Sequence, residues 1–395
     1  MRKLLYLGAL GLALFEAANV YFIMPMPGSQ RARSVELAYT PYTWRWAVRV
    51  ACVALMAAGL PAVLRGVAGL RRGRVRAAAP AALALVLAGG VAYAANARLA
   101  ADHMFLQPRA VRMAPAAGNG VDPRRLVVGV EVNGEARAYP LQFIGYHHQV
   151  RDTVGGTPVL VTYCTVCRTG RVYRPEVGGR GETFRLVGMD HFNAMLEDRT
   201  TGSWWRQANG EAIVGPRKGT RLAEVPSRQV TLARWLAMHP DSRVMQPDPA
   251  FAAEYAKGFA YEDGSSRRAL TGTDPVSWRD KAWVVGLTVG EASKAYDWNR
   301  LRRERVVNDD VGGTPVVVVL ASDGASFFAF RRPDRATRFA LRGDSLVAPG
   351  RSYALSGRGP AALGGRGPAD SLVPLPASQE FWHSWRTFQP GTARY

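Results

Sequence analysis

Three long apolar runs lie within the first hundred residues, and no comparable run follows them. They cover residues 4–26, 46–64 and 78–97. A helix needs about 20 apolar residues to cross the hydrocarbon core of a bilayer. The first run is too long for the core of a signal peptide and has no small-residue cleavage site before Pro25. The pattern therefore predicts a membrane domain over residues 1–105 with three transmembrane helices.

Two polar residues, Glu16 and Asn19, interrupt the first apolar run. An ionisable group inside a bilayer is costly, and it usually faces other helices or marks a site. For both residues we expect an interhelical hydrogen bond that orders the bundle.

Basic residues in the short loops predict the orientation of the spans. The N-terminus carries Arg2 and Lys3, and the loop between the second and third runs is rich in arginine. This loop contains Arg65, Arg71, Arg72, Arg74 and Arg76, whereas the opposite side has Arg31 and Arg33, plus Arg45 and Arg49 if they lie outside the membrane. The modest bias favours a cytoplasmic N-terminus. With three spans in the bacterial inner membrane, the C-terminal region would then be extracytoplasmic.

Beyond residue 105 the pattern changes to short β-type segments. Residues 127–132 and 136–139 read as strands, and the Asn133-Gly134 pair between them is a favoured two-residue hairpin turn. The run "PVLVTY" is continuously apolar or β-branched, which indicates a strand buried on both faces. Helices are fewer and are expected over 231–239, after a Thr cap, and over 248–258. A mostly β or α+β region is predicted.

An internal repeat is the strongest structural signal of the sequence. Residues 127–158 align without a gap with residues 284–315, at an offset of 157 residues. The likeness continues more loosely between "RWLAMHPDSRVM" and "SWRTFQPGTARY". The repeat predicts two homologous β-rich modules, a first one over 123–247 and a second, degenerate one over 280–395, which residues 248–279 connect.

Differences between the two copies indicate where chemistry could lie. Shared positions, such as the "VGGTP" turn, are assigned to folding. Four reactive groups occur in the first copy alone: Cys164, Cys167, His147 and His148 stand opposite Ala321, Gly324, Glu304 and Arg305. The comparison predicts a Cys and His site in the first module only.

The strong positive charge does not predict nucleic-acid binding. The formal net charge is +20, but only five of the 51 basic residues are lysine, and the arginines are spread along the chain. A basic face would gather them on one element. The expected partner is the lipid bilayer, and nucleic acid is not expected as a partner. A protein partner in the cell envelope is possible in principle, but the sequence does not identify it.

The three cysteines fall into two kinds of environment. Cys52 lies within the second apolar run, where it reads as a small apolar residue. Cys164 and Cys167 end one strand and precede another, "RTGRVY", so they are expected on a hairpin turn. A thioredoxin-type pair instead begins a helix. Thioredoxin-like catalysis is therefore disfavoured, although a disulfide across the turn is not.

Four interpretations of the cysteine pair stay open. Thiolates with imidazoles would suit copper or zinc, with Met189 and Met195 as further soft ligands. An extracytoplasmic pair could be a redox disulfide. Cys164 could be a nucleophile activated by His147 or His148, or the pair could only stiffen a turn. The candidate metal ligands are Cys164, Cys167, His147, His148 and His191, and the candidate catalytic residues are Cys164, Cys167 and His147.

The segments "AYPLQFIGYHHQVRD", "VGGTPVLVTYCTVCRTGRVY" and "DRTTGSWWRQANGEAIVG" resemble the bacterial and archaeal family known as domain of unknown function 3179. The likeness covers residues 123 to about 247. It implies that His147 or His148, Cys164 and Cys167 match the motif positions of the family, whose members are commonly exported or membrane-anchored. Some members have Thr at the position of Cys167, which favours Cys164 acting with a histidine.

The sequence thus predicts a membrane-anchored extracytoplasmic protein of unassigned activity with a Cys-x-x-Cys plus His site. That site would bind a transition metal or perform thiol and disulfide redox chemistry. The rivals are a catalytically silent envelope scaffold or interaction protein with a structural disulfide, and an enzyme with a cysteine nucleophile.

Overall fold

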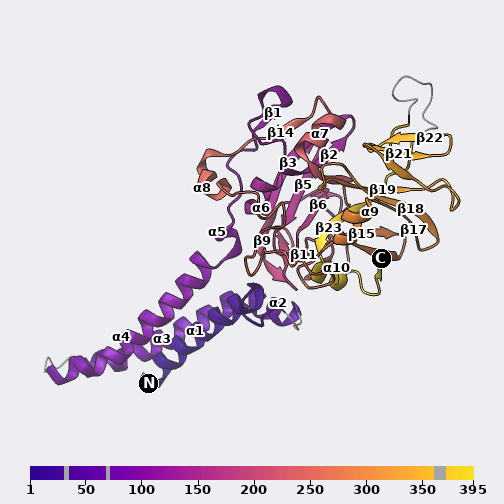
Figure 1. The fold of residues 1–395 in the computed structure, drawn as a ribbon. Helices are drawn as coiled ribbons and strands as arrows, with labels where there is room; N and C mark the ends of the chain where they lie inside the picture. The colour runs from indigo at the N-terminus through magenta and orange to yellow at the C-terminus, as the bar shows by residue number, and fades with distance from the viewer. Residues whose placement is uncertain (31–34, 68–71, 360–370) are drawn as a thin grey trace. The chain divides into compact units, whose positions relative to one another are not determined.

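A computed structural model describes residues 1–30, 35–67, 72–359 and 371–395 (Figure 1). The described chain forms two compact units. The first contains residues 1–106, 183–206 and 211–220, and the second contains residues 107–182, 207–210 and 221–395. Arg31, Arg33 and Arg71, which entered the orientation argument, lie outside the described residues.

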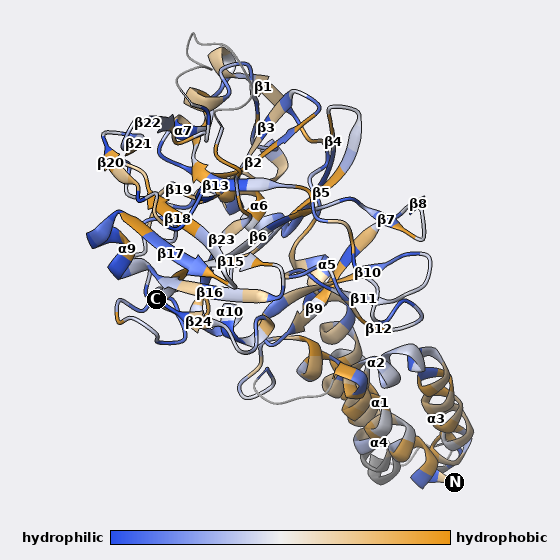
Figure 2. Ribbon diagram, turned by 90° about the vertical axis from the view of Figure 1, so that its right-hand side faces the viewer, coloured by the Kyte–Doolittle hydropathy of each residue, from blue (hydrophilic) through white to orange (hydrophobic). Residues whose placement is uncertain are grey.

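Within the described residues, the first unit contains three helices that are long and apolar enough to cross a membrane. They are α1 (Arg2–Ile23), α3 (Arg45–Val67) and α4 (Arg72–Tyr93), and Figure 1 shows them running alongside one another. Large apolar side chains such as Leu14 and Val86 are exposed on them, and Figure 2 shows apolar residues along all three. Hydrocarbon accommodates such surfaces, whereas water does not. The predicted N-terminal helices, followed by a mostly β region, are confirmed.

Close packing between α1 and α3 depends on small residues. A side chain at Gly8 would meet the Cys52 carbonyl oxygen, and one at Gly59 would meet the backbone of Leu5, each within 2.5 Å. Small residues let helices approach in this way within bilayers. Cys52 is 7 % exposed and packs among apolar neighbours, as its sequence position predicted.

A small sheet completes the first unit. Its strand order is β12-β11-β10-β9, and Val187, Met195 and Trp204 of this sheet pack against Val35 and Ala38 of α2. The remaining elements of this unit are α2 (Val35–Thr43), the π-helical turn η1 (Ala94–Arg98), α5 (Ala101–Met104), β9 (Phe184–Asp190), β10 (Asn193–Asp198), β11 (Trp204–Arg206) and β12 (Ala212–Val214).

The second unit begins with a five-stranded sheet of order β1-β14-β3-β2-β13 and a three-stranded sheet of order β4-β5-β6. Their elements are β1 (Met113–Pro115), β2 (Leu126–Val132), β3 (Glu135–Pro140), α6 (Leu141–His147), β4 (Gln149–Val154), β5 (Thr157–Cys164), β6 (Thr169–Tyr173), β13 (Ser227–Thr231), α7 (Leu232–Met238) and β14 (Arg243–Met245). The short elements nearby are η2 (Ala116–Gly118), β7 (Glu176–Val177), β8 (Arg180–Gly181), η3 (Pro249–Phe251) and α8 (Ala252–Tyr255).

Residues 283–359 and 371–394 of the same unit form sheets of order β23-β15-β16-β24, β17-β18-β19 and β20-β21-β22. The elements are β15 (Trp283–Val289), β16 (Ala292–Asp297), α9 (Trp298–Glu304), β17 (Val306–Val311), β18 (Thr314–Leu320), β19 (Phe327–Arg331), β20 (Ala340–Arg342), β21 (Ser345–Ala348), β22 (Arg351–Ala354), β23 (Ala377–Phe381), α10 (Trp382–Phe388) and β24 (Ala393–Arg394).

The two repeated sequence segments have the same order of elements. In each, a β-hairpin is followed by a short helix and three antiparallel strands, and a later strand then returns to pair with the first strand. The pairing registers also correspond. Gly129 of β2 faces Arg228 of β13, and Gly286 of β15 faces Ser378 of β23.

A glycine and a tryptophan hold the returning element close to the first strand in both segments. A Cβ atom at Gly129 would lie 2.3 Å from the Trp235 ring, and one at Gly286 would lie 2.1 Å from the Trp385 ring. Both tryptophans are buried. The indole therefore occupies the space that a side chain on the strand would need.

We expect Gly129→Ala and Gly286→Ala each to lower the free energy of unfolding by about 1–3 kcal/mol or more, because overpacking displaces a buried ring. Chemical denaturation followed by tryptophan fluorescence measures this loss. Gly181→Ala is the matched control, since a Cβ atom there meets nothing within 4 Å. Equal stability of the Gly286 and Gly181 variants would contradict the packing argument.

One predicted helix is shorter than expected. The sequence predicted a helix over 248–258, but only a 3-10 turn over Pro249–Phe251 and four residues of α8 form. The predicted cap is present, because Asp248 accepts a hydrogen bond from the Ala250 amide at 3.0 Å. Beyond Tyr255 the chain turns away, since the Arg125 guanidinium binds the carbonyl oxygens of Lys257 and Gly258.

Candidate functional site

The cysteine pair lies on the turn between β5 and β6. Cys164 ends β5 opposite Thr169 of β6, and Cys167 belongs to the connecting turn of residues 165–168. Arg168 completes the turn with a φ of +58°. The predicted hairpin is confirmed, and the last six residues of β5 are all buried, as the continuous apolar run indicated.

Both thiols are fully buried and neither belongs to a disulfide. Cys164 and Ser384 both lie close enough to Cys167 to change the pKa of its thiol. Burial raises the pKa of Cys167 well above its usual value and Cys164 adds to this, while Ser384 and Lys281 oppose it. Cys167 is therefore a thiol, not a thiolate, at neutral pH.

A buried glutamine holds the base of the hairpin together. Nε2 of Gln207 donates to Thr162 Oγ1 at 2.9 Å and to the Thr169 carbonyl oxygen at 3.0 Å. Thr162 in turn donates across the hairpin to the Arg171 carbonyl oxygen at 2.8 Å. The strands β5 and β6, which flank the cysteine turn, are thus joined by side-chain hydrogen bonds as well as by backbone hydrogen bonds.

Residues of the second repeated segment cover the turn. The Phe381 amide donates to the Cys167 carbonyl oxygen at 2.9 Å. Lys281 Nζ and His383 Nε2 both donate to the Val166 carbonyl oxygen, at 2.7 and 3.1 Å. Burial, together with the charge of Lys281, lowers the pKa of His383 to about 4, so its ring is neutral at neutral pH.

The Arg168 side chain ties the turn to two other segments. Its guanidinium donates to Gln379 Oε1 at 2.7 Å and to the carbonyl oxygens of Tyr261 and Glu262 at 2.7 and 3.1 Å. It also lies 3.6 Å from the centre of the Trp283 ring. Arg168 is fully buried, so these contacts replace all of its hydration.

A buried carboxylate pairs with Arg171 of β6, the strand that follows the cysteine turn. Glu380, 2 % exposed, accepts a hydrogen bond from Ser384 Oγ at 2.8 Å and one from Ser378 Oγ at 3.0 Å. Arg171 forms an ion pair with it at 2.8 Å. Glu380 is therefore held by two hydroxyls and one guanidinium.

The two adjacent histidines have different partners. His147 Nε2 contacts the Tyr255 hydroxyl, and its ring packs edge-on against Phe251 and Tyr255. His148 Nδ1 donates to the Tyr163 carbonyl oxygen at 2.8 Å. Burial lowers the pKa of His148 to about 4, against the effect of that hydrogen bond. The roles predicted for both histidines as ligand or general base stay predictions.

The predicted ligands His191, Met189 and Met195 belong to the first compact unit, whereas both cysteines belong to the second. His191 Nδ1 lies 2.7 Å from Asp190 Oδ1, and Met195 is buried in the sheet core. Within the residues that the structure describes, no three His, Cys, Asp or Glu side chains are grouped as a metal ion would require. The predicted copper or zinc site is not supported.

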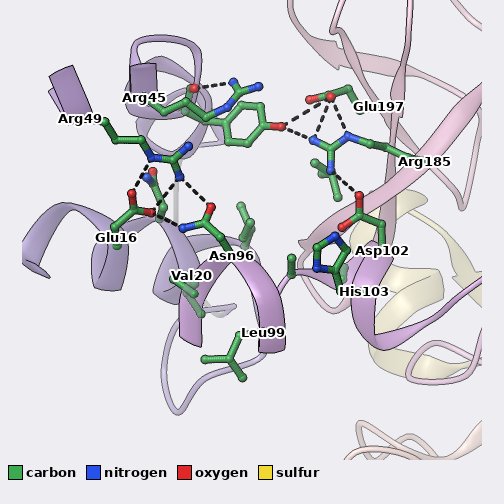
Figure 3. A pocket seen from close by; sticks show the side chains of 17 residues that line it. Glu16, Val20, Arg45, Arg49, Asn96, Leu99, Asp102, His103, Arg185 and Glu197 are labelled. Atoms are coloured by element: carbon green, nitrogen blue, oxygen red, sulfur yellow. Dashed lines mark hydrogen bonds and ion pairs between the residues drawn. The ribbon is translucent and has the colours of Figure 1, made fainter. Parts of the chain in front are cut away.

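A second polar cluster lies in the first unit, around a cavity of about 270 Å³ (Figure 3). Arg49 donates to both carboxylate oxygens of Glu16, at 2.6 and 3.0 Å, and to Asn96 Oδ1 at 2.6 Å. Across the cavity Arg185 pairs with Glu197. The expected interhelical hydrogen bonds of Glu16 are confirmed, and Asn19 lines the same cavity. Since the opposite charges are mutually paired, we assign this cluster to helix packing.

The comparison of repeats contained a signal for residues that the sequence analysis did not select. In the aligned C-terminal parts, Ser384 stands opposite Arg234, and the same offset places Glu380 opposite Val230 and His383 opposite Ala233. Polar groups present in one copy only were the criterion that selected the cysteines. These three residues meet the same criterion in the second copy.

Comparison with known proteins agrees with the resemblance and extends it. The model of a family described as "Protein of unknown function (DUF3179)" matches residues 106–392. The match covers both repeated segments and the connection between them, and not only residues 123 to about 247. No curated protein and no solved structure shows significant similarity to the chain. The chain belongs to the family DUF3179, whose activity is unassigned.

Proposed function

We propose that this protein is a membrane-anchored dithiol protein whose Cys164 and Cys167 cycle between two thiols and one disulfide. The observation that carries the proposal is the placement of both cysteines at one end of the hairpin, Cys164 as the last residue of β5 and Cys167 in the turn that follows it, close enough for Cys164 to raise the pKa of Cys167. A bond between them would close a turn that backbone pairing already holds.

The reaction is exchange with a small disulfide. A cysteine thiolate attacks one sulfur of the reagent, the S–S bond of the reagent breaks, and one small thiolate leaves. The other cysteine then attacks the mixed disulfide and releases the second small thiolate. The protein loses two electrons and two protons, and the reagent becomes two thiols. Because both side chains are buried, the reagent must be small and the cover over the turn must open.

The proposal also states that the C-terminal region with the cysteines is extracytoplasmic and that its fold arose from two copies of one module. An extracytoplasmic C-terminal region would meet an oxidising compartment, in which disulfides form and persist. The corresponding elements, registers and Gly–Trp contacts of the two segments support their origin as two copies of one module.

We expect detergent-purified protein carrying Cys52→Ser to form a Cys164–Cys167 disulfide when oxidised glutathione is added, and to return to two thiols with dithiothreitol. The intact mass falls by two hydrogen atoms, and peptide mapping locates the bond. Cys164→Ser abolishes this change completely and leaves Cys167 able to form only a mixed disulfide. A mass that stays constant in the parent protein would contradict the proposal.

A silent scaffold is the second candidate, and complete burial of both cysteines favours it, because buried structural thiols are inert. Burial also raises the pKa of Cys167. The same oxidation series separates the two. A scaffold would keep both thiols under native conditions and release them to alkylation only on unfolding.

A further inference from the structure

We propose that the cavity of the first unit binds the headgroup of a phospholipid that carries both a phosphate and a primary ammonium group, as phosphatidylethanolamine does. Arg45 would bind the phosphate and Asp102 would bind the ammonium group. The cavity is the one of about 270 Å³ that Figure 3 shows. This inference concerns lipid binding and is independent of the proposed redox function.

The cavity lies at one end of the helical bundle, at the depth where lipid headgroups would be. The last turns of α1, the first turns of α3 and the η1 segment that follows α4 all line it. Trp44 and Trp46 near the start of α3 and Tyr93 at the end of α4 are largely exposed. Trp and Tyr side chains are enriched where a bilayer meets water. These three side chains therefore place the cavity at the membrane surface.

The ion pairs that pack the helices leave one positive charge unpaired on the α3 wall of the cavity. Arg49 pairs with Glu16. Arg45, one turn earlier on the same face of α3, donates to the Tyr42 carbonyl oxygen at 2.7 Å, and its guanidinium lies 3.9 Å from the centre of the Tyr42 ring. Among the residues that the structure describes, no carboxylate pairs with Arg45. A guanidinium has several N–H donors, so Arg45 can donate to a phosphate as well.

The opposite wall of the cavity carries one negative charge in excess. Arg185 of β9 pairs with Glu197 at 2.8 Å and with Asp102 at 3.1 Å, so two carboxylates share one guanidinium. Figure 3 shows this group across the cavity from Arg49. The side chain of Asp102 is 31 % exposed and that of Glu197 is 13 % exposed. Asp102 is therefore the carboxylate that a second cation can reach more easily.

A ligand that matches both walls carries both charges. Three arginines and three carboxylates line the cavity, so its formal charge is zero when His103 is counted as neutral. An anionic headgroup without an amine would pair with Arg45 but would leave the excess carboxylate without a partner, and an unpaired charge is costly where water is limited. A phosphate with an ammonium group satisfies both walls by charge-assisted hydrogen bonds. The trimethylated ammonium of phosphatidylcholine has no N–H group to donate to Asp102.

Apolar side chains next to the cavity favour a lipid over a small zwitterion in solution. Val50 and Val53 of α3 are exposed and lie within about one turn of Arg49, and Leu14 of α1 is exposed close to Glu16. The acyl chains of a lipid would lie on these side chains, and burial of apolar surface would add to its affinity. O-phosphoethanolamine, which has the same charged groups without acyl chains, should therefore bind more weakly than the lipid.

The first test compares headgroups on the unmodified full-length protein, delipidated in detergent and mixed with one lipid at a time. Native mass spectrometry measures bound lipid, and thermal unfolding measures the stabilisation that a bound ligand gives. We expect phosphatidylethanolamine to bind about tenfold or more tightly than phosphatidylglycerol or phosphatidylcholine, because each of these lacks one charge-assisted hydrogen bond. Either of these lipids, or O-phosphoethanolamine, binding as tightly as phosphatidylethanolamine would overturn the proposal.

The second test assigns the two contacts. Asp102→Asn should lower the affinity for phosphatidylethanolamine by about tenfold without lowering that for phosphatidylglycerol, whereas Arg45→Gln should weaken both lipids. Arg98→Gln is the matched control and should change neither affinity, because Arg98 is an exposed arginine at the end of η1 that does not line the cavity. Circular dichroism checks that each variant is folded. A folded Arg45 variant that binds like the Arg98 variant, or an Asp102 variant that keeps the headgroup preference, would contradict the assignment.

Discussion

Arg168→Ala is expected to lower the free energy of unfolding by about 4 kcal/mol or more. The substitution removes three charge-assisted hydrogen bonds, each worth roughly 1.5–3 kcal/mol. It also leaves the carbonyl oxygens of Tyr261 and Glu262 and the amide oxygen of Gln379 without this donor. The contact with the Trp283 ring is lost as well. Chemical denaturation in detergent, followed by tryptophan fluorescence, measures the loss.

The same change should expose the cysteine turn, because Arg168 fastens it to the connecting segment and to β23. Native-state alkylation of Cys167 is then faster than in the parent protein. Arg174→Ala is the matched control: it removes an exposed arginine just after the same hairpin and should change neither quantity. An Arg168 variant as stable as the Arg174 variant would show that the turn is held by other contacts.

The second large effect is expected in the membrane helices. Glu16→Ala leaves the Arg49 guanidinium without its carboxylate in a setting that water does not reach freely, since Glu16 is 2 % exposed. Breaking a buried ion pair from one side typically costs about 3–5 kcal/mol. Thermal unfolding in detergent, monitored by the helical circular dichroism signal, should show a transition that falls by several degrees or more.

The double variant Glu16→Leu with Arg49→Leu provides the control for this prediction. Replacing both partners by apolar residues removes the desolvation cost together with the attraction, so most of the lost stability should return. Asn96, which donates to Glu16 Oε2 and accepts from Arg49, then loses both side-chain partners but keeps its bond to the Ala92 carbonyl oxygen. A double variant less stable than Glu16→Ala would contradict the assignment of this cluster to packing.

Local sequence patterns predicted those helices and strands that a few neighbouring residues are enough to specify. The apolar runs predicted α1, α3 and α4, the Asn133-Gly134 turn predicted the hairpin of β2 and β3, and Thr231 caps α7 as expected. The short helices α6 and α9 were not predicted. Each has seven residues, too few to form by propensity alone, and their stability comes from the sheets on which they pack.

The site could be predicted only in part, because its members come together through tertiary contacts. Cys164 and Cys167 follow from spacing and from the strand that precedes them. Lys281, Ser384 and Glu380 meet the turn only because β23 returns to pair with β15, and no local pattern specifies that approach. The metal interpretation was not supported because His191 belongs to the other compact unit, and no local pattern in the sequence predicts that division.

The most direct test of the central proposal is the reduction potential of the Cys164–Cys167 pair. Full-length protein with Cys52→Ser is equilibrated in glutathione buffers of graded redox ratio, quenched with acid and analysed by intact mass. We predict one two-electron transition with a midpoint above about −300 mV. Structural disulfides typically have midpoints below this value, and labile or functional disulfides have midpoints above it. Two thiols at every buffer ratio would contradict the account.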